Sequence, residues 1–240
     1  MPEPNRDRYN CVLQLFVMSC LELNNLSLRI SSINVNSMNV STLGTRNAKT
    51  YLKIEGVTGK KPDVIFLCDV RANNKGAELE KLFRMTRNGN YCLYLNSTRN
   101  VRGVGIAVKR SIAHEVKKIF RDLRNENYIL LDIEIKGKRL TLGSVYGPNE
   151  NNVNFFREIK AKLGDFGGNK WIVGGDFNTI LDMDRSSDNL DRLGAGRIPH
   201  KVNGEFINDW IAEGGSVEPF RALYPEVREI SYVSYRGWEG

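Results

Sequence analysis

Short apolar runs that alternate with helical segments constrain the fold of this chain more than any other sequence feature. The run at 63–68, DVIFLC, is continuous but too short for a helix, which is typical of a strand buried on both faces. Comparable strand-like runs lie at 91–95, 103–108, 140–145 and 171–175. Polar stretches with apolar residues at helical spacing separate them. The alternation predicts an α/β (α+β) fold.

The order of these segments favours hairpins over a single doubly wound sheet. One face of 129–135 is expected to carry Ile129, Leu131, Ile133 and Ile135, and a wetter face Leu130, Asp132 and Glu134. The turn at 136–138 leads into the run at 140–145. Further strands are predicted at 28–35 and 231–235, and helices at 45–56, 77–85, 153–163 and 206–211. Hairpins with helices between them predict two packed, mixed sheets flanked by helices.

Composition limits the class of protein. The chain has 240 residues and a net charge of +7, from 35 Lys and Arg against 28 Asp and Glu, which favours a polyanionic partner. The 4 cysteines show no zinc-ligand spacing, so we expect reduced thiols in an intracellular protein. No run approaches the ~20 apolar residues of a membrane span. The apolar run at 11–21 lacks a clear cleavage site, so residues 1–26 are interpreted as a poorly specified extension before one domain at 27–240.

Polar side chains follow several of the predicted strands, where a rigid element holds them close to solvent. They are Asn34, Asp69, Tyr146, Asp176 and Asn178. A single Asn or Asp after a strand is most often a turn former or a helix cap. Taken together, carboxylate and amide oxygens without paired His or Cys suit a hard cation, Mg²⁺ or alternatively Mn²⁺. Such a site suits phosphoryl chemistry, with one carboxylate activating water.

Five motifs resemble the endonuclease/exonuclease/phosphatase superfamily, and in particular the apurinic-type endonuclease domain of non-LTR (LINE-type) retrotransposons. They read SINVNS, DVIFLCDVR, RGVGIAV, SVYGPNE and GGDFNTILDMDRS, and they span about 28–235. The resemblance implies a four-layer α/β sandwich and Mg²⁺-dependent hydrolysis of a phosphodiester. It also implies a nuclease that nicks duplex chromosomal DNA in the nucleus, as part of a polyprotein with a reverse transcriptase.

The resemblance also implies a role for each strand-end residue. Asn34 matches an Asn that organises the metal and the catalytic carboxylate, and Asp69 lies at the metal-binding position. Tyr146 matches a Tyr near the scissile phosphate. Asp176 matches the Asp that orients and deprotonates water, and Asn178 matches an Asn that holds the phosphate.

Further residues take supporting roles by the same resemblance. Asp184 and Arg185 match a segment that supports the site, and Ser231 matches a Thr of a late strand. Arg192 and Arg197 lie in a basic loop, where we expect contacts to DNA phosphates.

Two departures from the family pattern predict weak activity or none. Asp69 stands where the family has Glu, and its carboxylate is one methylene shorter. The family's last two motifs, an R-x-D strand and S-D-H, are not found before Gly240, so the C-terminal strands are expected to be missing. His114, in a helix-like surface stretch with Lys117 and Lys118, is not expected to replace the terminal His.

Two alternatives to a nicking endonuclease stay open. One is a catalytically silent remnant that binds DNA. The other is a phosphatase-type member of the superfamily that acts on a phosphoinositol or lipid headgroup. The motif pair SVYGPN and GGDFNT, followed by the DRS segment, favours the retrotransposon branch over the phosphatases.

Overall fold

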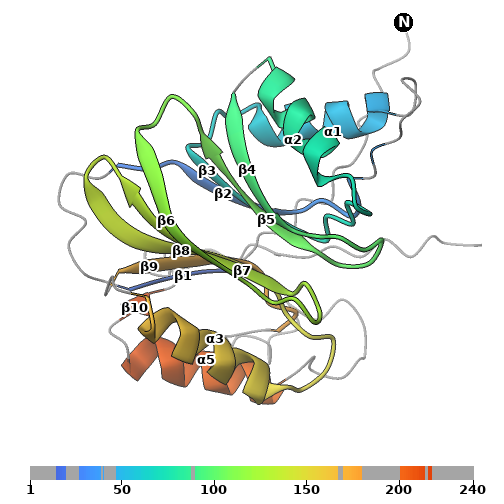
Figure 1. Cartoon of the computed structure of the whole chain (residues 1–240). Coiled ribbons are helices and arrows are strands. Elements are labelled where there is room, and N and C mark those ends of the chain that lie inside the picture. The colour runs from blue at the N-terminus through green and yellow to red at the C-terminus, as the bar shows by residue number, and fades with distance from the viewer. Residues whose placement is uncertain are drawn as a thin grey trace, which may run out of the picture.

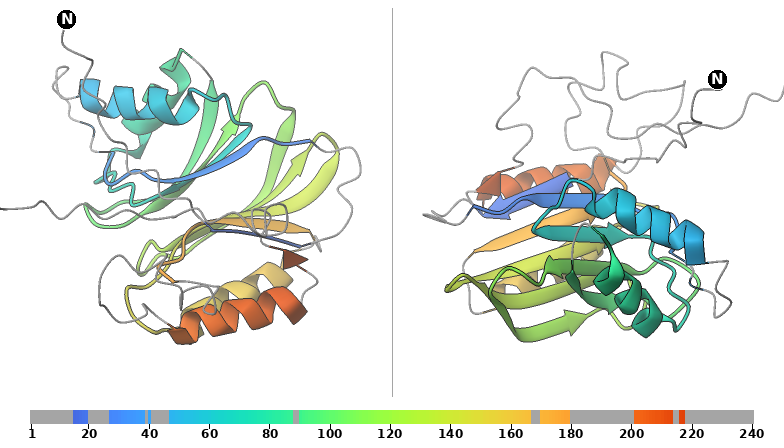
Figure 2. Two further views of the ribbon diagram at one scale, coloured as in Figure 1. Left: turned by 180° about the vertical axis from the view of Figure 1, so that it is seen from behind. Right: turned by 90° about the horizontal axis from the view of Figure 1, so that it is seen from above.

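Two β-sheets lie face to face, and helices cover the outer side of each, which makes four layers (Figure 1). The computed structural model describes residues 15–19, 27–38, 40, 47–87, 90–166, 170–179, 201–213 and 216–217. The view from behind shows the same layering (Figure 2). The predicted α/β class and the sandwich of two mixed sheets are confirmed.

The smaller sheet has the strand order β2-β3-β5-β4. Its strands are β2 (Ile30–Asn34), β3 (Val64–Cys68), β5 (Val104–Lys109) and β4 (Tyr91–Asn96), and its helices are α1 (Asn47–Thr58) and α2 (Gly76–Met85). The larger sheet has the order β10-β1-β9-β8-β7-β6. Its strands are β10 (Ser216–Val217), β1 (Leu15–Ser19), β9 (Trp171–Asp176), β8 (Lys138–Tyr146), β7 (Tyr128–Ile135) and β6 (His114–Arg121), and its helices are α3 (Val153–Gly164) and α5 (Lys201–Glu213).

Side-chain alternation along β3 explains why two cores meet at this strand. Val64, Phe66 and Cys68 point between the sheets, where they join apolar side chains of β7 and β8. Ile65 and Leu67 point to the other face, where they pack under α1 and α2. All five residues are buried, as the continuous apolar run predicts. A third core lies between the larger sheet and the helices α3 and α5.

Three segments differ from the sequence prediction. The stretch around His114 was expected to be helix-like, but it forms β6, an edge strand with an irregular register between Val116 and Lys118. Leu15–Ser19, within the expected extension, forms β1 and pairs antiparallel with β9. α5 begins at Lys201 and not at residue 206. The strand predicted at 231–235 lies outside the described residues.

The described helices include none that is both long and apolar enough to span a membrane.

Candidate active site

The polar ends of four strands meet at one end of the sandwich. β2 and β3 run parallel, with Asn34 opposite Cys68, and β8 and β9 run parallel, with Tyr146 opposite Asp176. Asn34 Nδ2 donates a hydrogen bond of 3.0 Å to Asp176 Oδ2, across the space between the sheets. The structure therefore joins the catalytic-type carboxylate to the amide predicted to organise it.

Asp176 is oriented from both of its oxygens. The backbone N–H of Asn178 donates to Asp176 Oδ1 at 3.1 Å, while Asn34 holds Oδ2. Asn178, at a positive φ of 49°, donates from Nδ2 to the carbonyl of Gly147 at 2.8 Å. The N–H of Gly147 in turn donates to the carbonyl of Asp176 at 2.7 Å. These bonds lock the ends of β8 and β9 together and leave Asp176 as a fixed acceptor.

Tyr146 interacts electrostatically with both carboxylates, Asp69 and Asp176. Burial raises the pKa of its phenol above the ordinary value, and the negative charges of Asp69 and Asp176 raise it further. The interaction with the Asn178 side chain lowers this pKa, but its effect is smaller. The phenol is therefore protonated at neutral pH and available as an O–H donor. A protonated phenol beside two carboxylates can donate to an anionic phosphate oxygen.

Asp69 is paired with Arg71, two residues later. Arg71 Nε donates to Asp69 Oδ1 at 2.7 Å and Nη2 donates to Oδ2 at 2.8 Å, a bidentate ion pair. The Asp69 side chain is 6% exposed and the Arg71 side chain 39%. The hydrogen bond to Asp69 raises the pKa of Arg71 above its ordinary value. Both residues have positive φ, which bends the chain so that the guanidinium returns to the carboxylate.

Lys53 of α1 holds the loop that follows Asn34. Its Nζ donates to the carbonyls of Val35, Asn36 and Ser37 at 2.9, 2.9 and 2.7 Å. Burial lowers the pKa of Lys53 from its ordinary value, although Asp69 raises it. The N–H of Asn36 donates to Asn34 Oδ1 at 3.0 Å, so this loop fixes the Asn34 amide.

Cys68 connects the two sheets under the site. Its thiol donates to the carbonyl of Val145 at 3.0 Å, and the N–H of Asp176 lies 3.4 Å from the sulfur. Burial raises the pKa of the thiol far above its usual range. The thiol therefore stays protonated, and its role is to hold the strands rather than to act as a nucleophile.

An arginine rim, defined as Arg99, Arg102 and Arg124, lies on the loops next to the site. The N–H of Arg71 donates to the carbonyl of Arg102 at 2.8 Å, which joins the rim to the Asp69 turn. Arg99 Nη2 donates to the carbonyl of Arg124 at 2.8 Å. Buried Glu126 accepts from the N–H of Thr98 at 3.0 Å and holds these loops together. The rim presents guanidinium groups suited to phosphate.

The described residues offer the donor atoms that a hard cation needs, but the carboxylate oxygens of Asp69 are already occupied by hydrogen bonds. Asp69 and Asn34 supply the oxygens that Mg²⁺ prefers, and these residues would hold it. Both oxygens of Asp69, however, accept hydrogen bonds from Arg71. Within the described ranges, no cluster of three or more His, Cys, Asp or Glu is arranged to hold a metal. A cation at Asp69 would therefore have to compete with the guanidinium.

The structure brings together Asn34, Asp69, Tyr146, Asp176 and Asn178, all predicted as site residues from the sequence. The other predicted residues lie outside the described part of the chain: Asp184, Arg185, Arg192, Arg197 and Ser231.

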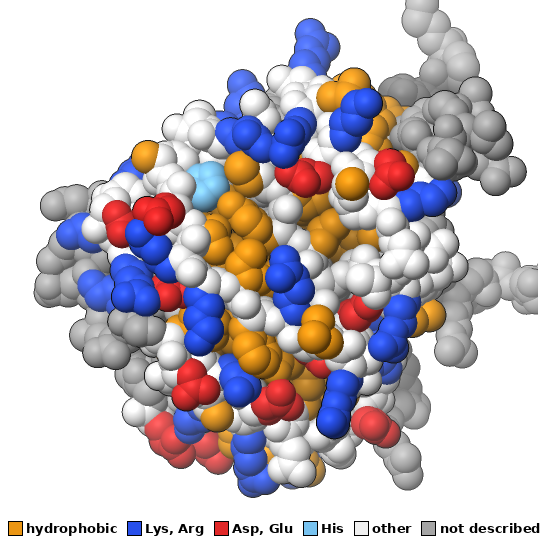
Figure 3. All heavy atoms as spheres, in the orientation of Figure 1, with side chains coloured by type: hydrophobic (Ala, Val, Ile, Leu, Met, Phe, Trp, Pro, Cys, Tyr) orange, Lys and Arg blue, Asp and Glu red, His pale blue; other side chains and the backbone are white. Residues whose placement is uncertain are grey.

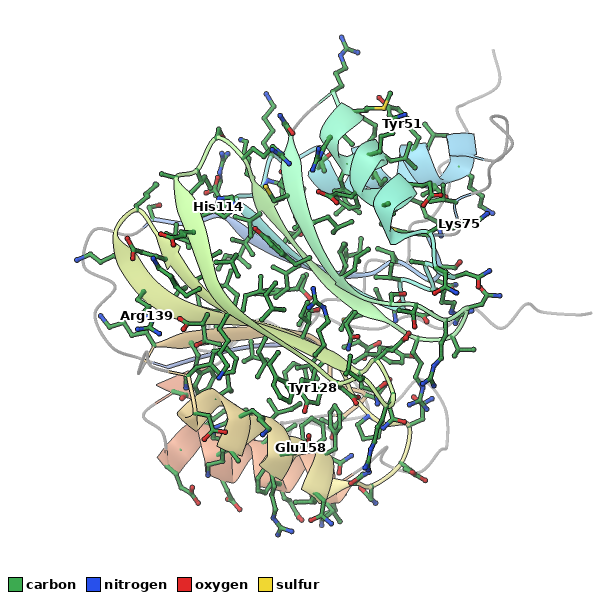
Figure 4. The ribbon with its side chains drawn as sticks, viewed as in Figure 1. Tyr51, Lys75, His114, Tyr128, Arg139 and Glu158 are labelled. Atoms are coloured by element: carbon green, nitrogen blue, oxygen red, sulfur yellow. The ribbon has the colours of Figure 1, made fainter. Side chains whose placement is uncertain are left out.

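His114 lies at the end of the larger sheet opposite the site. It begins β6, opposite Ile135, whereas Tyr146 ends β8. Figure 4 shows His114 and Arg139 at one end of the sheets and Tyr128 toward the other. His114 is thus separated from the predicted site residues along the strands, and its lack of a catalytic role stays a prediction.

Sequence reasoning did not identify Arg71, Lys53, Arg99 or Arg102 as residues at or near the site. Arg71 was visible in the motif DVIFLCDVR, but its contact with Asp69 depends on two positive φ angles that no residue pattern announces. Lys53 is one of many lysines, and only the packing of α1 directs it to the loop after β2.

Comparison with known proteins identifies the family. A model of the endonuclease/exonuclease/phosphatase family matches residues 31–235. No curated protein matches in sequence.

Several solved structures share the fold at low sequence identity. An AP endonuclease from Archaeoglobus fulgidus is 17% identical, with a TM-score of 0.62, over 89% of this chain and 80% of that one. The 3′ phosphatase NExo from Neisseria, bound to a product DNA hairpin, is 16% identical, with a TM-score of 0.60, over 88% and 80%. The endonuclease domain of TRAS1, a telomere-specific non-LTR retrotransposon, is 16% identical, with a TM-score of 0.50, over 78% and 72%.

The family match covers most of the strands that form the site, and the fold agrees with it. The chain belongs to the endonuclease/exonuclease/phosphatase family, whose members are hydrolases acting on phosphodiester bonds.

Proposed function

We propose that this chain is a Mg²⁺-dependent DNA endonuclease domain that nicks duplex DNA. Mn²⁺ is the alternative cation. The observation that carries the proposal is the hydrogen bond from Asn34 to Asp176, which orients one carboxylate beside Tyr146 and Asn178. This arrangement suits attack of a water molecule on a phosphodiester.

The mechanism follows from the hydrogen bonds that orient these groups. Asp176, fixed by Asn34 and by the N–H of Asn178, acts as general base and takes a proton from the attacking water. The water oxygen bonds to phosphorus as the bond from phosphorus to the 3′ oxygen breaks, and the leaving 3′ oxygen takes a proton from solvent. The phenol of Tyr146 donates to a phosphate oxygen, and the Asn178 amide helps to position the phosphate. A cation bound through Asp69 and Asn34 would neutralise negative charge on the phosphate.

DNA as the substrate is supported by charge and by relatives. The loops that carry the three arginines of the rim adjoin the site through the backbone hydrogen bond from Arg71 to Arg102. NExo, of similar fold, was solved with a product DNA hairpin. The TRAS1 domain belongs to a non-LTR retrotransposon, and the motifs of this chain resemble that branch. We therefore propose a retrotransposon parent, a polyprotein with a reverse transcriptase, and action on chromosomal DNA in the nucleus.

A catalytically silent DNA-binding remnant is the second candidate. The bidentate Asp69–Arg71 pair favours it, because the carboxylate at the metal-binding position is already neutralised.

A plasmid-nicking assay tests the proposed function. Supercoiled plasmid is incubated with the full chain and Mg²⁺, and relaxed product is quantified. Asp176→Ala should lower the nicking rate by about 10²-fold or more, the usual contribution of a general base. Asp165→Ala removes a carboxylate that is 66% exposed at the end of α3 and should leave the rate unchanged.

Nicking that survives Asp176→Ala, or that continues in EDTA, contradicts the proposed mechanism. Plasmid binding without nicking, measured by gel shift, favours the silent remnant.

A further inference from the structure

The turn that follows β3 places a positive side chain where a cation would bind. We propose that the Arg71 guanidinium is a built-in competitor for the divalent cation at Asp69, so that the cation binds only when Arg71 releases this carboxylate. The inference rests on the proposed function, because it concerns the cation of the same site.

The geometry satisfies Asp69 without a metal. The two hydrogen bonds, at 2.7 and 2.8 Å, engage both carboxylate oxygens with the parallel N–H groups of one guanidinium. This fork-to-fork contact is the strongest form of an Arg–carboxylate pair. With an Asp69 side chain that is only 6% exposed, water competes poorly for these oxygens.

The backbone holds the pair in place. Asp69 has a φ of 56° and Arg71 a φ of 52°, both in the left-handed region. The intervening Val70 is buried, and its N–H donates to the carbonyl of Gly103 at 3.0 Å. The tertiary structure thus positions each of the three residues, and the guanidinium is pre-organised to bind the carboxylate.

Local charge points the same way. The carboxylates of Asp69 and Asp176 are matched by the cations of Arg71 and Lys53, and both positive groups interact electrostatically with Asp69. An entering cation therefore meets a neutral cluster and not a negative one. It must also lose water, which Mg²⁺ does reluctantly. Removing the Arg71 charge should make the cluster negative and strengthen cation binding.

Mn²⁺ binding to the full chain without DNA tests this inference. Free Mn²⁺ is measured by its EPR signal during titration at fixed ionic strength. Arg71→Gln should bind Mn²⁺ at least about tenfold more tightly than the unmodified chain, since a hydrogen bond to a charged group changes equilibria by this factor. Arg71→Lys keeps the charge but loses the fork, and its affinity should fall between the two.

Two controls define the site. Arg84→Gln removes another arginine–carboxylate pair, with Glu80 on α2, and should leave the Mn²⁺ affinity unchanged. Asp69→Asn should weaken binding, alone and combined with Arg71→Gln. Thermal unfolding of each variant shows that it is folded, and Arg71→Lys serves as the second test should Arg71→Gln fail to fold.

The outcomes separate the inference from the proposed function. Equal affinity for Arg71→Gln and the unmodified chain, with loss of binding in Asp69→Asn, overturns the competition and leaves the proposed cation site standing. Tighter binding that persists in the double variant also overturns it. Absence of Mn²⁺ binding in every variant overturns both the inference and the cation dependence of the proposed function.

Discussion

Two glycines allow the catalytic-type strand ends to approach each other. A Cβ on Gly147 would lie 2.1 Å from the carbonyl oxygen of Phe177, and a Cβ on Gly175, at a φ of 150°, would lie 1.9 Å from that of Val145. Any larger residue would separate β8 from β9 at the level of Tyr146. The geometry of the site therefore depends on these two glycines as well as on its polar side chains.

Gly147→Ala should destabilise the chain and impair the site. The added methyl meets backbone, which is held by two hydrogen bonds with the 176–178 turn, so the strand end must move. We expect a loss of about 1–3 kcal/mol in the free energy of unfolding, measured by urea denaturation. Gly164→Ala is the matched control, because nothing lies within 4 Å of its Cβ, and it should be neutral or slightly stabilising. Equal stability of the two variants would contradict this interpretation of Gly147.

At the scale of elements, the edge strand β6 explains the main error of the sequence prediction. Lys117 and Lys118 are exposed, and the register shifts between Val116 and Lys118, so the apolar/polar alternation of a strand is interrupted. Charged side chains and bulges are the usual means by which an edge strand avoids pairing with other chains. Figure 3 shows hydrophobic side chains between Lys and Arg side chains on the face that is turned to the viewer in Figure 1.

The β7–β8 hairpin contains an ion pair that should make stability depend on pH. Asp132, 3% exposed, accepts two hydrogen bonds from Arg139, 50% exposed, at 2.9 and 2.6 Å. The hydrogen bonding with Arg139 lowers the pKa of Asp132 below its ordinary value. Because the folded pKa lies below the unfolded one, the pair stabilises the chain fully above an unfolded pKa of about 3.9 and this stabilisation is lost as pH falls through the folded pKa.

Asp132→Asn should therefore lower the free energy of unfolding by about 1 kcal/mol at pH 7, a value reduced by the exposure of Arg139. Urea denaturation between pH 3 and pH 7 should show the difference from the unmodified chain shrinking at the acidic end. Asp165→Asn, at an exposed position, should track the unmodified chain throughout. A difference independent of pH would show that the charge of Asp132 is not the cause.

At the scale of the whole molecule, the site and the arginine rim occupy the same end of the sandwich. The N–H of Tyr146 donates to the carbonyl of Asn127 at 2.7 Å, and Arg102 Nη1 lies 3.3 Å from Asn127 Oδ1. Asn127 thus connects the end of β8, which carries Tyr146, to Arg102 of the rim. The chain has a net charge of +7, and the arginines of the rim are positive residues on loops that adjoin the site.

Loss of rim arginines should reduce DNA affinity and its salt dependence. The double variant Arg99→Gln, Arg124→Gln should weaken duplex binding at low salt. It should also lower the slope of log affinity against log salt by about one unit for each DNA phosphate that is no longer neutralised by a guanidinium. Fluorescence anisotropy at several salt concentrations measures both. Arg84→Gln with Arg110→Gln removes the same charge elsewhere, and a matching loss there would mean that net charge, rather than the rim, binds DNA.

The amino-acid sequence by itself determined the layers and the chemical groups of the site. Buried strands are continuous apolar runs, as at Val64–Cys68, and the residues following them need only strand direction to be placed. Asn34, Asp69, Tyr146, Asp176 and Asn178 were accessible in this way, because the carboxyl ends of parallel strands share one edge of a sheet.

Tertiary structure alone decided how these groups are engaged. The Asn34–Asp176 bond crosses between two sheets, and the hold of Lys53 on the loop depends on where α1 packs. The Asp69–Arg71 pair depends on left-handed backbone angles at both residues. The sequence pattern of one segment indicates its burial and its periodicity, because both are properties of a single helix or strand. Contacts across sheets depend on the packing of distant segments. The Asp69–Arg71 pair is local in sequence, but its turn is held by backbone hydrogen bonds from Val70 to Gly103 and from Arg71 to Arg102.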